Sequence, residues 1–206
     1  MLPKIKNIIF DIGRVIVGYQ EQDVIAAVLP DSKHKQFYVE NFFKSQIWQD
    51  LDRGIVTASD VIQHLSTFPN HPESVAADVK KITTTFVSQL PLLEGSQELF
   101  ISLAKQYPIY ILSNFQDEPF DQLLELHPFL KLAKGMVVSA KIKMMKPEVQ
   151  IYSFLLNTFS LTANECLFLD DRAENIEVAK TKGLHGIVFE NAAQARLALK
   201  DYNIQL

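Results

Sequence analysis

Five short runs of apolar and often β-branched residues recur along the chain. They are "IIFDI" near 8–12, "IYILSN" near 109–114, "MVVSA" near 136–140, "CLFLDD" near 166–171 and "GIVFE" near 186–190. Continuous apolar runs of this length are typical of parallel strands that are covered on both faces. Helical patterns separate the later runs, at about 95–106, 147–158 and 173–182. The alternation predicts an α/β fold with a doubly wound, Rossmann-like parallel sheet.

Two residues mark expected helix boundaries. Pro147 suits the first turn of the second helix, because a proline lacks the N–H group that would have no partner there. Gly183 is expected to end the third helix in a left-handed conformation.

The interval after the first strand departs from this alternation of strands and helices. About a hundred residues separate Asp11 from Ser113, whereas a βαβ unit needs only about 30. The interval shows little strand pattern, and Thr57 and Asp60 form a capping-box-like helix start. Helices are expected at about 21–29, 34–45, 58–67 and 73–88. We therefore predict a core domain of residues 1–18 and 91–206, with a small all-helical cap of residues 19–90 over the carboxyl edge of the sheet, where open α/β sheets place their ligands.

Composition excludes several classes of function. The net charge of −4 and the absence of a long Lys/Arg cluster indicate no basic surface that would bind nucleic acid. No apolar run approaches the roughly 18 residues that span a bilayer, and no secretory signal precedes the first strand, so no membrane association is expected. Cys166 is the only cysteine and cannot form an internal disulfide, which fits a reducing, cytoplasmic location. The five histidines lack the spacing of zinc ligands.

Polar residues lie at the ends of the predicted strands, or just beyond them. They are Asp11, Ser113-Asn114, Lys146 and Asp170-Asp171. The ends of parallel strands converge at one edge of a sheet, and this combination suggests phosphoryl transfer. Carboxylates supply the oxygen ligands that a divalent cation prefers, while a hydroxyl and a Lys can hold phosphate oxygens. A carboxylate at Asp11 could attack phosphorus and form an aspartyl-phosphate.

Each of these residues taken alone also fits a structural role. A single Asp at a strand end commonly caps a turn, Ser113-Asn114 is a common turn pair, and Lys146-Pro147 fits a helix start. Asp170-Asp171 is the most informative element, because adjacent acids repel each other unless a cation or solvent relieves them. Taken together, in this order and at the ends of the predicted strands, the four elements indicate a functional site.

The segments "FDIG", "ILSN", "KPEVQIY" and "LFLDDRAENIEVAKTKG" resemble, in order, the four motifs of the haloacid dehalogenase-like (HAD) hydrolase superfamily. The resemblance covers nearly the whole chain, with residues 20–90 in place of the small helical cap. It implies a Mg²⁺-dependent phosphatase that acts on a small phosphorylated metabolite. The turn at Gly54, near Trp48 and Arg53, is implied to face the active site, with Trp48 itself in the core.

The resemblance also implies a role for each motif residue. Asp11 would be the nucleophile and a Mg²⁺ ligand, and Lys146 would act with it. Gly13 would bind the metal through its carbonyl oxygen. Asp170 would complete the metal site, with Asp171 at or near the metal. The residues expected to bind or lie beside phosphate are Ser113, Asn114 and Lys146, and Asn175 would orient the loop after the fourth strand.

Gly13 departs from the pattern of most phosphatases of the superfamily. They carry a second Asp there, as general acid and base, and losing such a group typically costs about 10²–10⁴ in rate. A "D-x-G" first motif with a helical cap is similar to a branch that includes sugar-1-phosphate phosphatases. An anomeric hydroxyl is a better leaving group, so a sugar 1-phosphate would need less help.

Two alternatives remain open at this stage. The hydrolytic 2-haloacid dehalogenases of the superfamily also lack the second Asp and use no metal, but a metal-free site has no need of Asp170-Asp171 beside a nucleophilic carboxylate. A non-catalytic phosphometabolite-binding protein would keep the binding residues without turnover. A receiver domain fits poorly because the acid pair comes last, and no G-x-G-x-x-G follows the first strand for a dinucleotide. The sequence does not indicate the oligomeric state.

Overall fold

The computed structural model describes residues 4–206. Within that range five parallel strands form one sheet in the order β3-β2-β1-β4-β5. The strands are β1 (Asn7–Phe10), β2 (Ile109–Ser113), β3 (Gly135–Val138), β4 (Cys166–Asp170) and β5 (His185–Val188). Each begins and ends within two residues of the predicted position, and the predicted α/β fold with a parallel sheet is confirmed.

Side chains of successive strand residues point to opposite faces of the sheet, and helices bury both faces. Ile8 and Phe10 belong to one apolar layer, which α6 (Ser96–Ala104) and α11 (Ala192–Ala198) cover. Ile9 belongs to the opposite layer, beneath α9 (Val149–Thr158) and α10 (Ala173–Thr181). This two-sided burial explains why the strands read as continuous apolar runs rather than as an alternating pattern.

The topological switch point of the sheet lies beside β1. The chain proceeds from β1 to β2 and β3 on one side, and then crosses back to place β4 on the other side. Phe10 pairs with Leu169, and the backbone N–H of Asp11 donates to the carbonyl oxygen of Leu169 at 2.9 Å. Asp11 and Asp170 therefore emerge side by side at the edge where open α/β sheets bind ligands.

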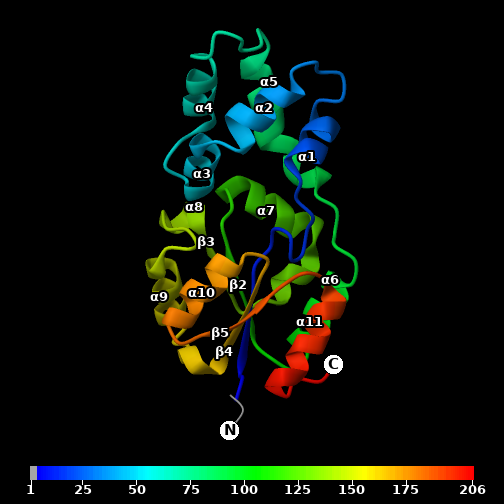
Figure 1. Cartoon of the computed structure of the whole chain (residues 1–206), viewed down its shortest axis with the longest axis vertical. Coiled ribbons are helices and arrows are strands. Elements are labelled where there is room, and N and C mark those ends of the chain that lie inside the picture. Colours follow the sequence, from blue (N-terminus) through cyan, green and yellow to red (C-terminus); the bar gives the residue numbers. More distant parts are fainter. Residues whose placement is uncertain (1–3) are drawn as a thin grey trace.

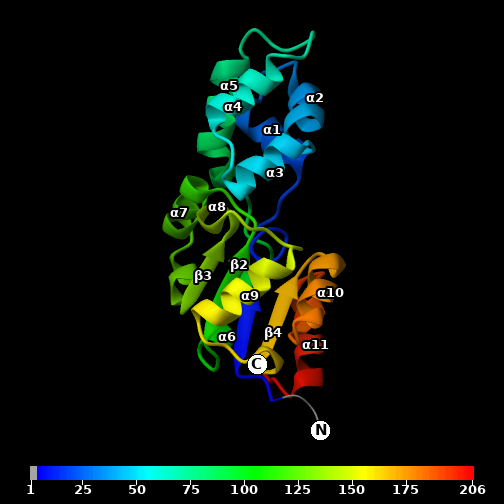
Figure 2. The same ribbon diagram turned by 90° about the vertical axis from the view of Figure 1, so that its left-hand side faces the viewer.

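Residues 21–89, called the helical segment below, stack beyond this carboxyl edge and form the other end of an elongated molecule (Figures 1 and 2). Their α-helices are α1 (Glu21–Val28), α2 (Lys35–Tyr38), α3 (Gln46–Arg53), α4 (Ala58–Leu65) and α5 (Val75–Thr85). The capping box at the start of α4 is present, because Thr57 and Asp60 each accept a hydrogen bond from the other's backbone N–H. The division into a core and a cap stays a prediction, and residues 1–3 of that core lie outside the described chain.

Four α-helices of the described chain do not appear among the predicted ones: α3, α7 (Asp117–Leu126), α8 (Ser139–Ile142) and α11. The predicted helix at 34–45 is split into α2 and a π-helical stretch, Val39–Phe43. The predicted end of α10 is confirmed, since Gly183 follows it with a φ of +85°. Within residues 4–206 no helix has the length and apolar character needed to cross a membrane.

The predicted start of α9 at Pro147 is wrong. The helix begins at Val149, and Lys146 and Pro147 lie in the turn before it. The side chain of Asn114 explains this difference. Its Oδ1 accepts from the backbone N–H of Lys146 at 2.8 Å and its Nδ2 donates to the carbonyl oxygen of Lys146 at 2.9 Å, so Asn114 binds the Lys146 backbone outside the helix.

Candidate active site

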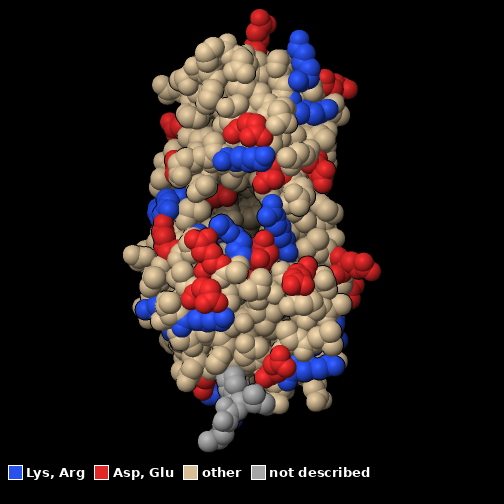
Figure 3. Space-filling view, in the orientation of Figure 1, with Lys and Arg blue, Asp and Glu red and all other residues tan. Residues whose placement is uncertain are grey.

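A cavity of about 700 Å³ lies between the helical segment and the carboxyl edge of the sheet. It is visible as a hollow midway along the molecule, with acidic and basic side chains interleaved around it (Figure 3). Asp11, Asn114, Lys146 and Asp171 line its sheet side, and Trp48, Gln49, Asp52 and Arg53 of α3 line the opposite side. The cavity therefore joins residues that are up to about 160 positions apart in the sequence.

Lys146 links the two acidic strand ends. Its Nζ lies 2.7 Å from Oδ1 of Asp11 and 2.7 Å from Oδ2 of Asp170. The Lys146 side chain is 2% exposed, so the ion pairs are shielded from solvent. Burial acts to lower the pKa of Lys146, but the two carboxylates outweigh it and raise that pKa. Lys146 is therefore held as a buried cation directly beside the predicted nucleophile.

Asp170 is fixed by hydrogen bonds on both carboxylate oxygens. Oδ1 accepts from the backbone N–H of Arg172 at 2.9 Å and from Nδ2 of Asn175 at 2.8 Å, while Oδ2 faces Lys146. Asn175 is buried, and it ties the first turn of α10 to the end of β4. The expectation that Asn175 orients this loop agrees with that contact.

The carboxylates of Asp11, Asp170 and Asp171 form one cluster, with an oxygen of each lying within 4.8 Å of the others. Burial raises the pKa of Asp11 to about 7, assisted by the charge of Asp170 and opposed by Lys146. Burial, and then the charge of Asp170, also raise the pKa of Asp171. Three crowded acids beside a single Lys make a site whose charge a divalent cation would balance.

Two further features fit a metal and a phosphate. Gly13 lines the same cavity, and its carbonyl oxygen accepts no hydrogen bond from the described residues. Ser113 is 1% exposed, and its Oγ has no hydrogen-bond partner within residues 4–206. A buried hydroxyl without a partner is costly, so a ligand oxygen would satisfy it. Ser113 ends β2 next to the cavity-lining Asn114, although Ser113 itself does not line the cavity.

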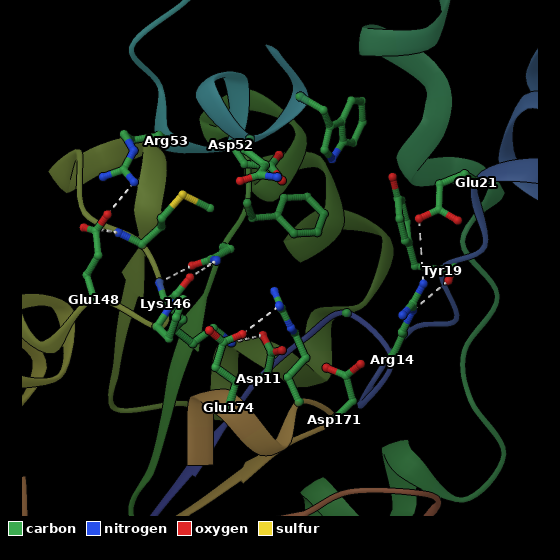
Figure 4. A pocket seen from close by; sticks show the side chains of 18 of the residues that line it. Asp11, Arg14, Tyr19, Glu21, Asp52, Arg53, Lys146, Glu148, Asp171 and Glu174 are labelled. Atoms are coloured by element: carbon green, nitrogen blue, oxygen red, sulfur yellow. Dashed lines mark hydrogen bonds and ion pairs between the residues drawn. The ribbon is translucent and has the colours of Figure 1, made fainter. Parts of the chain in front are cut away.

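The helical segment contributes a wall that sequence reasoning identified only in part. Arg53, beside the turn at Gly54, lines the cavity, although Gly54 itself does not, and Trp48 is 8% exposed among aromatic neighbours that include Phe42 and Phe86. That the turn faces the active site stays a prediction. Trp48 nevertheless also lines the cavity. The cavity residues that the sequence did not identify include Tyr19, Asp52 and Glu148 (Figure 4). Asp52 lies beside Arg53 and the turn at Gly54, and Glu148 lies in the segment "KPEVQIY", but neither was assigned a role from the sequence.

Comparison with known proteins identifies the family. Residues 8–189 match the family model described as haloacid dehalogenase-like hydrolase. The chain belongs to this family. A sesquiterpene phosphatase of Aspergillus oryzae is 25% identical over 188 residues, which cover 91% of each chain. A D-ribitol-5-phosphate phosphatase of Bacteroides thetaiotaomicron is 26% identical, over 95% of this chain and 97% of the relative.

A crystal structure of a HAD family enzyme from Bacteroides thetaiotaomicron, in complex with magnesium and inorganic phosphate, has the same fold. The TM-score is 0.73 at 21% sequence identity, and the match covers 91% of this chain and 95% of the other. The predicted membership of the HAD superfamily, and with it the prediction of a hydrolase, are confirmed. The role of each individual site residue stays a prediction, although the structure brings Asp11, Lys146, Asp170 and Asp171 together.

Proposed function

We propose that this HAD hydrolase is a Mg²⁺-dependent phosphatase that removes phosphate from a small phosphorylated metabolite through an aspartyl-phosphate on Asp11. The observation that carries the proposal is the buried contact of Lys146 with both Asp11 and Asp170, inside a cluster of three carboxylates. Two phosphatases to which the chain is similar over nearly their whole length support this reaction class.

The residues present fit a Mg²⁺ ion. Carboxylate oxygens of Asp11, Asp170 and Asp171 and the carbonyl oxygen of Gly13 are the hard oxygen donors that Mg²⁺ binds. When bound, the ion would neutralise phosphate charge as a Lewis acid. The same ion would lower the pKa of Asp11, because a nearby positive charge favours the carboxylate.

The other residues then have defined tasks. The Asp11 carboxylate attacks phosphorus, and water later hydrolyses the resulting acyl phosphate. Lys146 offsets the charge on the phosphate oxygens, and Ser113 donates its unpartnered hydroxyl to one of them. Asn114 positions Lys146 through its two hydrogen bonds to the Lys146 backbone. The helical segment acts as a cap that faces the leaving group.

The substrate class depends on how the leaving group receives a proton. Gly13 supplies no acid, so a sugar 1-phosphate, whose anomeric hydroxyl is the better leaving group, would be hydrolysed most readily unless a group elsewhere in the cavity supplies the proton. A panel of sugar 1-phosphates, sugar 6-phosphates and nucleotides with Mg²⁺ tests this preference. Equal or faster hydrolysis of alkyl phosphates would contradict it.

Release of phosphate from 4-nitrophenyl phosphate tests the reaction itself. We expect release that requires Mg²⁺, stops on chelation and is abolished in Asp11→Asn. Equal rates in the wild type and Asp11→Asn would contradict the assignment of Asp11. Metal-independent release of halide from a 2-haloacid would instead indicate a dehalogenase, and stabilisation by phosphometabolites without phosphate release would indicate a binding protein.

A further inference from the structure

Position 13 has room for a side chain but carries none. A Cβ atom built at Gly13 would meet no atom within 4 Å, so packing does not prevent a carboxylate there. A leaving alkoxide is strongly basic and needs a proton as the P–O bond breaks. If the proposed phosphatase acts on substrates with such leaving groups, another group in the cavity has to supply that proton.

Asp52 lies on the opposite wall of the same cavity. Figure 4 shows Asp52 on the side of the helical segment, facing across the cavity from Asp11. A leaving group in line with the attacking Asp11 carboxylate points away from the sheet and therefore toward this wall. Oδ1 of Asp52 accepts a hydrogen bond from Nε2 of Gln116 at 3.1 Å, whereas Oδ2 has no partner within residues 4–206. One oxygen is thus held, and the other is available to a ligand.

Asp52 is also anchored to the core through its backbone. Its carbonyl oxygen accepts a hydrogen bond from Oγ of Ser139, and the same Oγ accepts from the backbone N–H of Phe115. Gly54, two residues later, has a φ of +70° and lies so close to α8 that a Cβ would be 2.7 Å from the carbonyl oxygen of Ala140. The position of the Asp52 carboxyl group is therefore defined relative to the strand ends.

The surroundings of Asp52 favour the protonated acid. Burial raises the pKa of Asp52 to about 7, and the hydrogen bond from Gln116 opposes that rise only in part. Asp52 lies in the last turn of α3, where the partial negative charge of the helix terminus also disfavours a carboxylate. The charged or titratable groups on or next to α3, α7 and α8 and in the nearby cavity lining are Tyr19, Asp50, Arg53, Asp117, Glu118, Asp121, Glu125, Lys141, Lys143 and Glu148.

Most of the nearby cations are engaged elsewhere. Arg53 pairs with Glu148, Lys143 donates to the carbonyl oxygen of Gly54, and Lys141 pairs with Asp117 and Asp121. No ion pair to Asp52 exists among the described residues. A carboxyl group without a counter-ion, partly buried and facing a ligand cavity, is suited to donate a proton near neutral pH.

We propose that Asp52 is the general acid and base that replaces the side chain missing at Gly13. This inference rests on the proposed phosphatase function. In the first step Asp11 forms a bond to phosphorus, the P–O bond to the leaving group breaks, and the leaving oxygen takes the proton of Asp52. In the second step water attacks phosphorus, gives one proton to the Asp52 carboxylate, and displaces Asp11. Asp52 ends protonated, and one water has been consumed for each phosphate released.

Two aryl phosphates of similar size test this role. Phenyl phosphate has the more basic leaving group and depends on an acid, whereas 4-nitrophenyl phosphate has a weakly basic one and depends on it far less. In Asp52→Asn, which is isosteric and keeps an acceptor for Gln116, we expect kcat/KM for phenyl phosphate to fall about 10²-fold or more. The expected fall for 4-nitrophenyl phosphate is less than about 10-fold.

Asp50→Asn is the matched control, since Asp50 lies on the same helix but outside the cavity, and it accepts from Gln46. It should leave both substrates unchanged. Equal losses on both substrates in Asp52→Asn, or no loss on either, would overturn the role of Asp52. If the wild type releases no phosphate with Mg²⁺, the proposed function fails, which is a separate result from a failure of the Asp52 inference alone.

Discussion

The two walls of the cavity are built in different ways. On the sheet side, Asp11, Lys146 and Asp170 are buried and connected by hydrogen bonds and ion pairs to three strand ends. On the side of the helical segment, Asp52 and Arg53 are partly exposed, and few polar contacts join them to the core. We call these two sides the floor and the roof.

The difference indicates that the floor and the roof have different functions. The floor is fixed before any ligand binds, as electrostatic stabilisation of a reacting phosphate requires. The polar contacts of the roof with the core are few and are made by Asp52, Arg53 and Gly54, while Phe86 of the helical segment packs against Phe115 of the core. Substitutions in the floor should therefore have large effects on stability and chemistry, and substitutions in the roof should act mainly on substrate selection.

The largest effect is expected from Lys146→Met. Removing Lys146 leaves two buried carboxylates without a counter-ion, and breaking a buried pair typically costs about 3–5 kcal/mol. We expect that loss in the free energy of urea unfolding, measured with a chelator present. The matched variant Lys141→Met removes an exposed Lys from its pairs with Asp117 and Asp121 and should cost less than about 1 kcal/mol. Similar costs for the two variants would remove the distinction between a buried floor and a solvated surface.

A roof substitution, Gly54→Ala, is expected to have the next largest effect. Alanine is strained at a φ of +70°, by about 1–2 kcal/mol, and its Cβ would press on Ala140. The roof should move away from the core, so KM should rise. Stabilisation by Mg²⁺ in thermal unfolding should persist because the floor is unchanged. Ile55→Ala, at an exposed neighbouring residue, serves as the control. Loss of the Mg²⁺ effect in Gly54→Ala would show that floor and roof are not independent.

Asp52→Asn should alter how stability depends on pH. The pKa of Asp52 is raised from 3.8 in the unfolded chain to about 7, so the folded state binds more protons between these values. Stability from this group is fully present below about pH 4 and is lost as pH rises through about 7. Relative to Asp52→Asn, the wild type should lose on the order of 1 kcal/mol across this window, a figure reduced for the partial exposure of Asp52. A constant difference, measured by urea unfolding at several pH values, would show that folding does not raise the pKa of Asp52.

The smallest effect is expected for Arg53→Met. The ion pair of Arg53 with Glu148 joins roof to floor, but both side chains are partly exposed. Its loss should cost less than about 1 kcal/mol, and added salt should shrink that cost. The free energy of urea unfolding, measured at low and at high salt, gives this cost and its dependence on salt. A larger, salt-independent cost would mean that the roof is held as firmly as the floor.

The floor was largely predictable from the sequence. Apolar runs located the strands, and a polar residue at each strand end located Asp11, Ser113 and Asp170, because parallel strands converge at one edge. The turn that holds Lys146 was misassigned as the start of a helix. The pattern "KP" fits a helix start, and only the tertiary contact with Asn114 reveals the turn.

The roof was predictable only as a set of helices. The side of α3 that faces the sheet depends on how the helical segment packs, and no local pattern specifies that orientation. Helix α3 itself was overlooked, although Gly54 marks its end. Asp52 consequently was not identified from the sequence. Its burial and its hydrogen bond from Gln116, 64 residues away, are properties of the folded chain.

Trapping the covalent intermediate is the most direct test of Asp11 as the nucleophile. The enzyme is quenched with acid during turnover of 4-nitrophenyl phosphate with Mg²⁺, digested, and analysed by mass spectrometry. We predict one phosphoryl group on the peptide that contains Asp11, absent without Mg²⁺ and absent in Asp11→Asn. Steady phosphate release by a wild-type enzyme that is phosphorylated on another residue, or by an Asp11→Asn variant, would contradict the account.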